Sequence, residues 1–127
     1  MKEQIQKVEK FHNEFKQKNA TGPTNITEKE YALRHSLLME ENDEYMQACI
    51  EDDIVEIADA LGDQLYILCG TILKHGLQHK IEEVFNEIHL SNMSKLDANG
   101  EPILREDGKI MKSNRYFKPD IAKIVYK

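Results

Sequence analysis

Apolar residues recur every three or four positions along most of this chain, which is the spacing of an amphipathic helix. Four stretches show this periodicity, and short polar or glycine-containing segments separate them. We therefore expect an all-α fold, organised as a four- to five-helix bundle. The predicted helices span residues 2–18, 27–49, 52–74 and 78–93.

Signals at the helix ends support these boundaries. Gly22-Pro23 punctuates the loop after the first helix. Thr27 and Glu30 have the spacing of a capping box, in which each side chain bonds a backbone N–H at the helix start. The acidic run 51–53 predicts a break followed by a first turn that suits the positive end of the next helix.

The pattern changes after the fourth predicted helix. Asn99-Gly100 and Asp107-Gly108 are turn signals, and the apolar residues that flank the second of them predict a small hairpin. We expect a single domain over residues 1–127, with a helical core at 2–95 and an extended tail at 96–127.

Composition narrows the class of protein. About 40% of the 127 residues are apolar and 31% are charged, which is typical of a globular protein, and a net charge of −6 argues against a nucleic-acid binder. Cys49 and Cys69 are too few for a disulfide framework and are expected to be buried free thiols. The first ten residues lack a signal peptide, and no apolar run is long enough to span a membrane. We expect a cytoplasmic protein with no membrane or nucleic-acid partner.

Charge is distributed very unevenly along the chain. Ten Asp and Glu residues, and no Lys or Arg, lie between His35 and Leu73. Because the whole chain carries −6, the remainder is slightly basic. A local charge of this size is repulsive unless water screens it or cations neutralise it.

Helical geometry places several of these acids among apolar residues. Glu41 falls in the middle of the apolar stripe of the second predicted helix, where an unpaired carboxylate is costly to bury. The third predicted helix carries its acids on one narrow line made of Glu56, Asp59 and Asp63. If the two helices are antiparallel, Glu41 and Glu44 face Glu56 and Asp59.

Four acids in one cleft predict a divalent cation, and all-oxygen ligands favour Mg²⁺ first, with Mn²⁺ as a second candidate. A di-iron centre is less favoured because it needs two Glu-x-x-His pairs, and only Glu9 and His12 supply one. The alternative is that these acids line a solvated groove without an ion.

Two motifs in this region resemble a known family. Glu40-Glu41-x-x-Glu44 followed by Glu56-x-x-Asp59 is similar to the EExxE…ExxD signature of all-α nucleoside triphosphate pyrophosphohydrolases, the MazG-like and phosphoribosyl-ATP pyrophosphohydrolase-like proteins. Downstream, residues 91–95 read SNMSK and resemble a box found in a MazG-like subgroup. The resemblance covers nearly the whole chain.

The resemblance implies Mg²⁺-dependent cleavage of a (deoxy)nucleoside triphosphate or related nucleotide to the monophosphate and pyrophosphate. It also implies an interlocked homodimer, or a dimer of dimers. Carried onto this sequence, Glu41, Glu44, Glu56 and Asp59 become the metal ligands. Glu40 becomes a further ligand or a group that orients the attacking water, so Glu40 and Glu41 are the expected catalytic residues.

Other residues are candidates for contacts to the nucleotide. Lys95, with Asn92 one turn before it, is expected to bind the leaving pyrophosphate, and Lys109 in the tail is a further candidate. Asp63 could contact water, metal or a sugar hydroxyl, or could simply be an exposed acid, and His12 could stack on a base or belong to the core. The alternative function is a non-enzymatic helical protein that binds a cation or a partner through its acidic groove.

Overall fold

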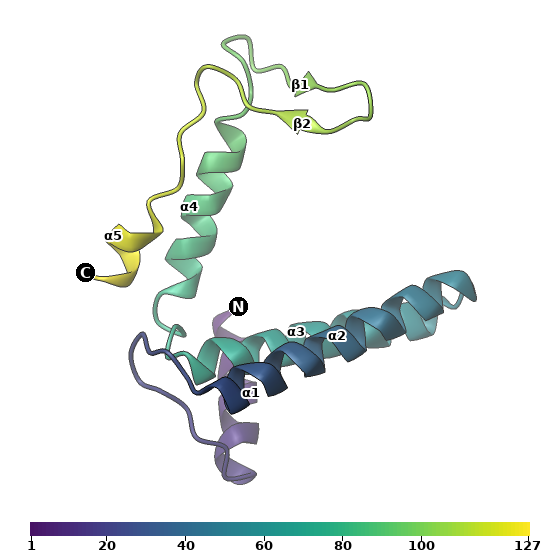
Figure 1. Ribbon diagram of the computed structural model, residues 1–127, viewed down its shortest axis with the longest axis vertical. Helices are drawn as coiled ribbons and strands as arrows, with labels where there is room; N and C mark the ends of the chain where they lie inside the picture. The colour runs from purple at the N-terminus through teal and green to yellow at the C-terminus, as the bar shows by residue number, and fades with distance from the viewer. The chain divides into compact units, whose positions relative to one another are not determined.

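Five helices and one short hairpin account for the regular structure of Met1–Lys127, all of which the computed structural model describes (Figure 1). The chain divides into two compact units, Met1–His79 and Lys80–Lys127, and each is described by itself. The expected all-α class is confirmed, and the predicted hairpin is present as two strands of two residues each. The first unit holds α1 (Lys2–Glu14), α2 (Glu28–Ile50) and α3 (Ile54–Lys74), and the second holds α4 (Ile81–Met93), β1 (Ile103–Leu104), β2 (Ile110–Met111) and α5 (Ile121–Val125).

Helices α2 and α3 form a long antiparallel hairpin (Figure 1). The predicted capping box opens α2: Glu30 N donates to Thr27 Oγ1 at 3.3 Å, and Thr27 N donates to Glu30 Oε2 at 3.0 Å. Asp52 adopts a left-handed backbone with φ 52°, which reverses the chain. Asp53 then caps α3 by accepting from the backbone N–H groups of Val55 and Glu56. Residues next to each helix end therefore fix the start of α2 and the turn between α2 and α3.

Helix α1 is shorter than the sequence pattern predicts. It ends at Glu14, and Lys16 takes a left-handed backbone with φ 57°, so the chain leaves the helix there. Ile5 and Val8 are buried as expected, whereas Phe11 and Phe15 are 41% and 64% exposed. The two phenylalanine rings lie against each other with centroids 4.4 Å apart, which stabilises an aromatic pair outside the core.

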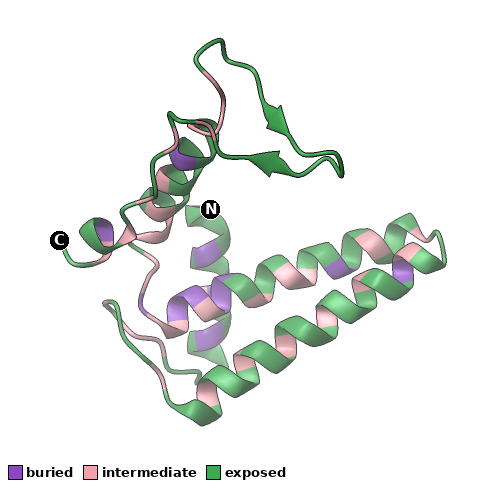
Figure 2. Cartoon of the chain, turned by 45° about the horizontal axis from the view of Figure 1, so that its top comes forward, coloured by how far each residue is buried: buried purple, intermediate pink, exposed green.

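The core of the first unit lies where α1 meets the C-terminal half of α3 (Figure 2). Leu73 and Cys69 are fully buried there. The loop after α1 is fastened to the same end of α3, because Ala20 N donates to the Leu73 carbonyl at 3.1 Å and Thr24 N donates to the His75 carbonyl at 2.8 Å. Cys49 is half-buried and Cys69 buried, and both are free thiols, as the composition predicted.

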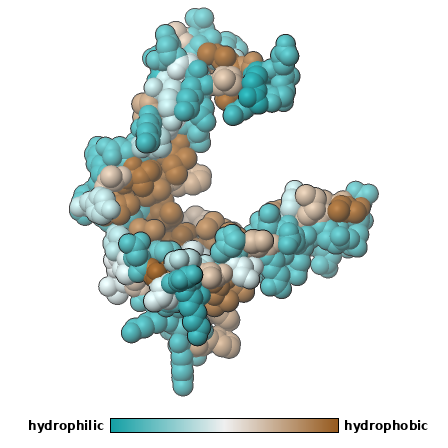
Figure 3. Space-filling view, in the orientation of Figure 1, coloured by the Kyte–Doolittle hydropathy of each residue, from teal (hydrophilic) through white to brown (hydrophobic).

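One apolar face of the α2–α3 hairpin remains uncovered. The sequence predicts Ile54, Leu61, Leu65 and Leu68 on the apolar side of α3, yet all four are exposed, Ile54 to 74%. Towards the tip of the hairpin, apolar atoms lie at the surface beside hydrophilic ones (Figure 3). No helix combines the length and the apolar character that crossing a membrane requires.

Serines fasten the tail of the second unit to α4. Ser91 Oγ donates to the Phe117 carbonyl at 2.8 Å, and Ser113 Oγ donates to the Leu96 carbonyl at 2.8 Å. Ser91 is buried, so its hydrogen bond satisfies a hydroxyl that water does not reach. Ser91, the first residue of the SNMSK segment, therefore has a structural role within this unit. Whether the two units make one domain, as the sequence predicts, stays a prediction.

Candidate metal centre

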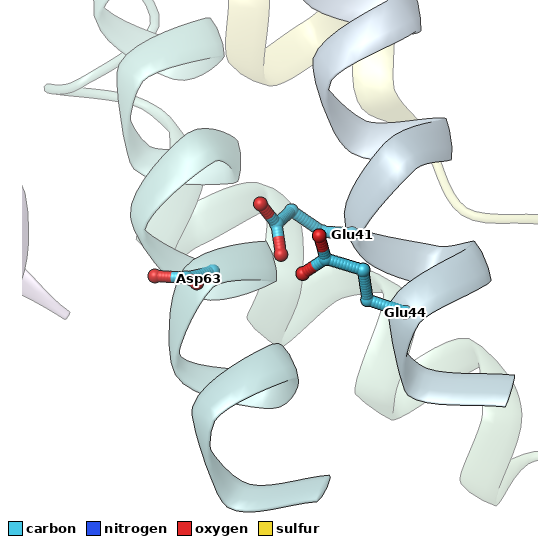
Figure 4. A group of neighbouring side chains, drawn as sticks. All are labelled: Glu41, Glu44 and Asp63. Atoms are coloured by element: carbon cyan, nitrogen blue, oxygen red, sulfur yellow. The ribbon is translucent and has the colours of Figure 1, made fainter. Parts of the chain in front are cut away.

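Three carboxylates from the two helices of the hairpin form an acidic cluster (Figure 4). Glu41 and Glu44 project from neighbouring turns of α2, and Asp63 lies across from them on α3. One oxygen of each lies within 4.8 Å of the others, so the three residues, called the acidic triad below, could share one cation. Gln64 Nε2 donates to the Glu41 carbonyl at 3.3 Å and holds the two helices together at this level.

Glu41 occupies an environment that disfavours its charge. The residue is half-buried, and its Oε2 is buried without a hydrogen-bond partner. Burial raises the pKa of Glu41 from 4.5 to about 7, and the neighbouring charges of Glu44 and Asp63 add to the rise. None of the ion pairs in the structure involves the acidic triad. An unpaired buried oxygen among three acids fits a hard divalent cation, which supplies the missing positive charge.

The predicted ligands Glu56 and Asp59 are not members of the acidic triad. Both are exposed, and Glu56 lines a separate pocket of about 220 Å³ together with Glu44 and Ala48. The reason is the register of the hairpin, which sets Gln64 beside Glu41 and Glu56 beside Ala48, nearer the turn. Glu44 therefore borders both the acidic triad and the pocket that contains Glu56.

The sequence left open whether Asp63 contacts water, metal or a sugar hydroxyl or is simply an exposed acid, and in the structure Asp63 is the α3 member of the triad. The sequence did contain the signal for this position. Asp63 lies on the same helical line as Glu56 and Asp59, one turn beyond Asp59. The pattern identified the face of α3 that carries Asp63 without identifying which turn of that face lies opposite Glu41.

The remaining predicted site residues lie in different settings. His12 is only 4% exposed, and its Nδ1 is 2.6 Å from Asn19 Oδ1, so its ring offers little surface on which a base could stack. Burial lowers the pKa of His12. Glu40 is exposed on α2. Of the predicted substrate residues in the second unit, Asn92 and Lys109 are exposed and Lys95 is half-buried.

Comparison with protein families shows what the chain is similar to. The model of the phosphoribosyl-ATP pyrophosphohydrolase family matches residues 8–92, which is more than half of the chain. The matched range contains the whole α2–α3 hairpin and the complete acidic triad. A comparison with curated proteins found no match. The subgroup suggested by the SNMSK segment stays a prediction.

Proposed function

Because the chain belongs to the phosphoribosyl-ATP pyrophosphohydrolase family, we propose that it is a Mg²⁺-dependent enzyme that cleaves a (deoxy)nucleoside triphosphate or related nucleotide to the monophosphate and pyrophosphate. Family membership supports a pyrophosphohydrolase activity on a nucleotide. The observation that supports the metal dependence is the orphaned, buried Oε2 of Glu41 among three carboxylates.

The residues present fit a divalent cation. Glu41, Glu44 and Asp63 offer oxygen donors from two rigid helices, and carboxylate oxygens favour Mg²⁺ or Mn²⁺ over softer ions. Glu56 and Asp59 remain proposed ligands, because they lie on the same line of α3 and Glu56 shares a pocket with Glu44. Since Glu41 has a pKa of about 7, the ion-free protein carries a proton there for part of the time at neutral pH. Binding of the ion should therefore release protons.

The protein's own groups have distinct roles in the proposed reaction. A bound divalent cation neutralises charge on the phosphate chain and lowers the pKa of water. Glu41, Glu44 and Asp63 hold that charge in place at the cluster. Glu40, exposed beside Glu41, is proposed to orient the attacking water and accept its proton. Lys95, with Asn92 and Lys109, is proposed to bind the anionic leaving group, for which ammonium and amide N–H groups are suitable donors.

A homodimer is part of the proposal, with a dimer of dimers as its extension. A groove of about 610 Å³ runs along the exposed apolar face of the hairpin, and Leu38, Leu61, Leu65 and Leu68 line it. These side chains are between 36% and 49% exposed. A second copy of the chain would remove this apolar area from water, which favours association.

The dimer is tested by light scattering coupled to gel filtration. Leu65→Glu should shift the protein from dimer to monomer, because it places a charge in the groove. Leu104→Glu, at a 58% exposed position of the β-hairpin, is the matched control and should leave the mass unchanged. A monomeric wild type, or a Leu65→Glu variant with the wild-type mass, would contradict a dimer through this groove.

The activity is tested with a panel of nucleotides and ³¹P NMR. Purified protein is incubated with Mg²⁺ and each of the common NTPs and dNTPs, with phosphoribosyl-ATP included. The expected products are a monophosphate and pyrophosphate from at least one nucleotide, and EDTA should stop the reaction. Orthophosphate and a diphosphate would show a different cleavage. Binding of Mg²⁺ without release of pyrophosphate from any nucleotide would instead favour a non-enzymatic cation-binding protein.

A further inference from the structure

Arg34 is a half-buried cation without an acidic partner. It lies on α2 seven residues before Glu41, on the same face of the helix and about 10 Å away along its axis. Its Nε donates to Thr71 Oγ1 at 3.0 Å, and its Nη2 donates to the Ile67 carbonyl at 2.8 Å. These bonds use two of the five guanidinium N–H groups and leave the others without a protein partner.

A second cation lies near this guanidinium. Lys74, at the end of α3, donates from Nζ to the Lys18 carbonyl at 2.8 Å and forms no ion pair. Burial lowers the pKa of Arg34 and of Lys74, and the charge of Arg34 lowers the pKa of Lys74 further. The nearby acid is Glu30, whose Oε2 accepts hydrogen bonds from the N-cap residue of α2. The charge of Glu30 raises the pKa of Lys74 and so partly balances this ammonium, whereas Arg34 has no acidic partner.

The backbone of α3 leaves room for this arrangement at Gly70. A Cβ atom there would lie 2.5 Å from Arg34 Nη2 and 3.0 Å from His12 Nε2. Glycine is a poor helix former, costing about 1 kcal/mol relative to alanine in a helix interior. The absence of a side chain at position 70 allows the guanidinium to lie against α3 beside His12.

A purely structural link between α2 and α3 does not account for these features. Two hydrogen bonds to a carbonyl and a hydroxyl need only neutral donors, whereas a half-buried charge costs free energy unless an anion balances it. A guanidinium with free N–H groups next to an ammonium matches the geometry and charge of a phosphate group.

We propose that Arg34 and Lys74 form an anion subsite that binds a phosphate group of the substrate. This inference rests on the proposed function, since it supplies that function with a second contact to the nucleotide. The subsite and the acidic triad lie on one face of α2, and an extended nucleotide is long enough to reach both. The phosphate belongs either to the far end of the triphosphate chain or to a separate position on the nucleotide.

Binding of inorganic phosphate to the metal-free protein tests the subsite without turnover. Isothermal titration at low ionic strength should show phosphate binding to the wild type and at least a tenfold weaker affinity for Arg34→Gln, because a charged hydrogen-bonding partner is lost. Arg105→Gln is the matched control, since Arg105 is exposed in the hairpin and pairs with Asp107. Equal phosphate affinity in the wild type and Arg34→Gln, or an equal loss in Arg105→Gln, would overturn the proposal.

A second variant guards against a folding defect in Arg34→Gln. Gly70→Ala should keep the helix, because alanine favours it. Its Cβ, 2.5 Å from Arg34 Nη2 and 3.0 Å from His12 Nε2, should displace the flexible end of Arg34 and shift the His12 ring by only a few tenths of an ångström. Its thermal midpoint should therefore remain close to that of the wild type, while its phosphate affinity falls severalfold. If Gly70→Ala binds phosphate as tightly as the wild type does, Arg34 is not part of a phosphate site.

Kinetics with two kinds of nucleotide identify the source of the phosphate. If Arg34→Gln raises KM with kcat unchanged for every nucleoside triphosphate, the subsite binds the triphosphate chain. If KM rises only for a nucleotide with a separate phosphate, such as phosphoribosyl-ATP, the subsite binds that group. Unchanged KM for both kinds would overturn a role in substrate binding. Loss of phosphate affinity in a protein that releases no pyrophosphate would instead leave the subsite intact and refute the proposed activity.

Discussion

Replacing Glu41 with Gln should stabilise the protein in the absence of divalent cations. The folded protein brings Glu41 within 4.8 Å of Glu44 and Asp63, and the unfolded chain does not hold them together. Each carboxylate pair at that distance repels by about 1 kcal/mol when water screens it well. The variant removes two such pairs, so its free energy of unfolding at about pH 8 should be about 2 kcal/mol higher than that of the wild type.

The difference should depend on pH with a defined sign. Because the pKa of Glu41 rises from 4.5 to about 7 on folding, the folded protein retains a proton that the unfolded chain releases between these values. The stability of the wild type should therefore fall as pH rises through this window. The Glu41→Gln variant lacks this titration, so the two proteins should be nearly equal in stability near the acidic end of the window.

Mg²⁺ should stabilise the wild type more than the Glu41→Gln variant. At a concentration 100 times its dissociation constant, an ion that binds only the folded state stabilises it by about 2.7 kcal/mol. If the variant binds tenfold more weakly, its gain falls to about 1.4 kcal/mol. Urea unfolding followed by circular dichroism, with and without Mg²⁺, measures both quantities. Asp43→Asn, at an exposed position of α2 outside the triad, is the control. It should change neither the free energy of unfolding without Mg²⁺ nor the stabilisation that Mg²⁺ gives. A destabilised Glu41→Gln variant that gains as much from Mg²⁺ as the wild type would refute the reasoning.

Three further predictions concern the fold. Thr27→Ala removes the capping box and should cost about 1 kcal/mol in chemical denaturation, whereas unchanged stability would mean that α2 does not depend on its cap. Gly76→Ala should lower the thermal midpoint, because φ is +66° there and a Cβ would collide with the Gly22 backbone; Gly62→Ala, which has open space, should not lower it. Ser113→Ala should speed tryptic cleavage of the tail, since its hydroxyl holds the tail to the end of α4, and a wild-type rate of cleavage would argue against that role.

The helix content and the starts of α2 and α3 were readable from the sequence, because local interactions decide them. The capping box at Thr27 and the acidic cap at Asp53 are both formed by residues within one turn of the helix start. The first helix was predicted too long because its apolar spacing continues to Phe15, whereas the left-handed backbone at Lys16 ends it. Periodicity reports which face is apolar and does not report where the chain stops being helical.

The helix faces that carry the acids were predictable from the sequence, but the register between the two helices was not. The sequence placed Glu41 and Glu44 on one face of α2. It placed Glu56, Asp59 and Asp63 on one face of α3. The register of α2 against α3 depends on the length of the connection between them and on side-chain packing along the hairpin. The apolar pattern of a single helix carries no information on either of these. Likewise, the burial of His12 depends on contacts from other elements, such as its hydrogen bond to Asn19.

The most direct test of the central claim is pyrophosphate release by the wild type, Glu41→Gln and Asp43→Asn in the presence of Mg²⁺. The best nucleotide from the panel is used as substrate, and circular dichroism first establishes that all three proteins are folded. The wild type and Asp43→Asn should release pyrophosphate only with Mg²⁺, and release by Glu41→Gln should be reduced at least a hundredfold. Wild-type turnover by folded Glu41→Gln, or release that does not depend on a divalent cation, would contradict a metal centre built on the acidic triad.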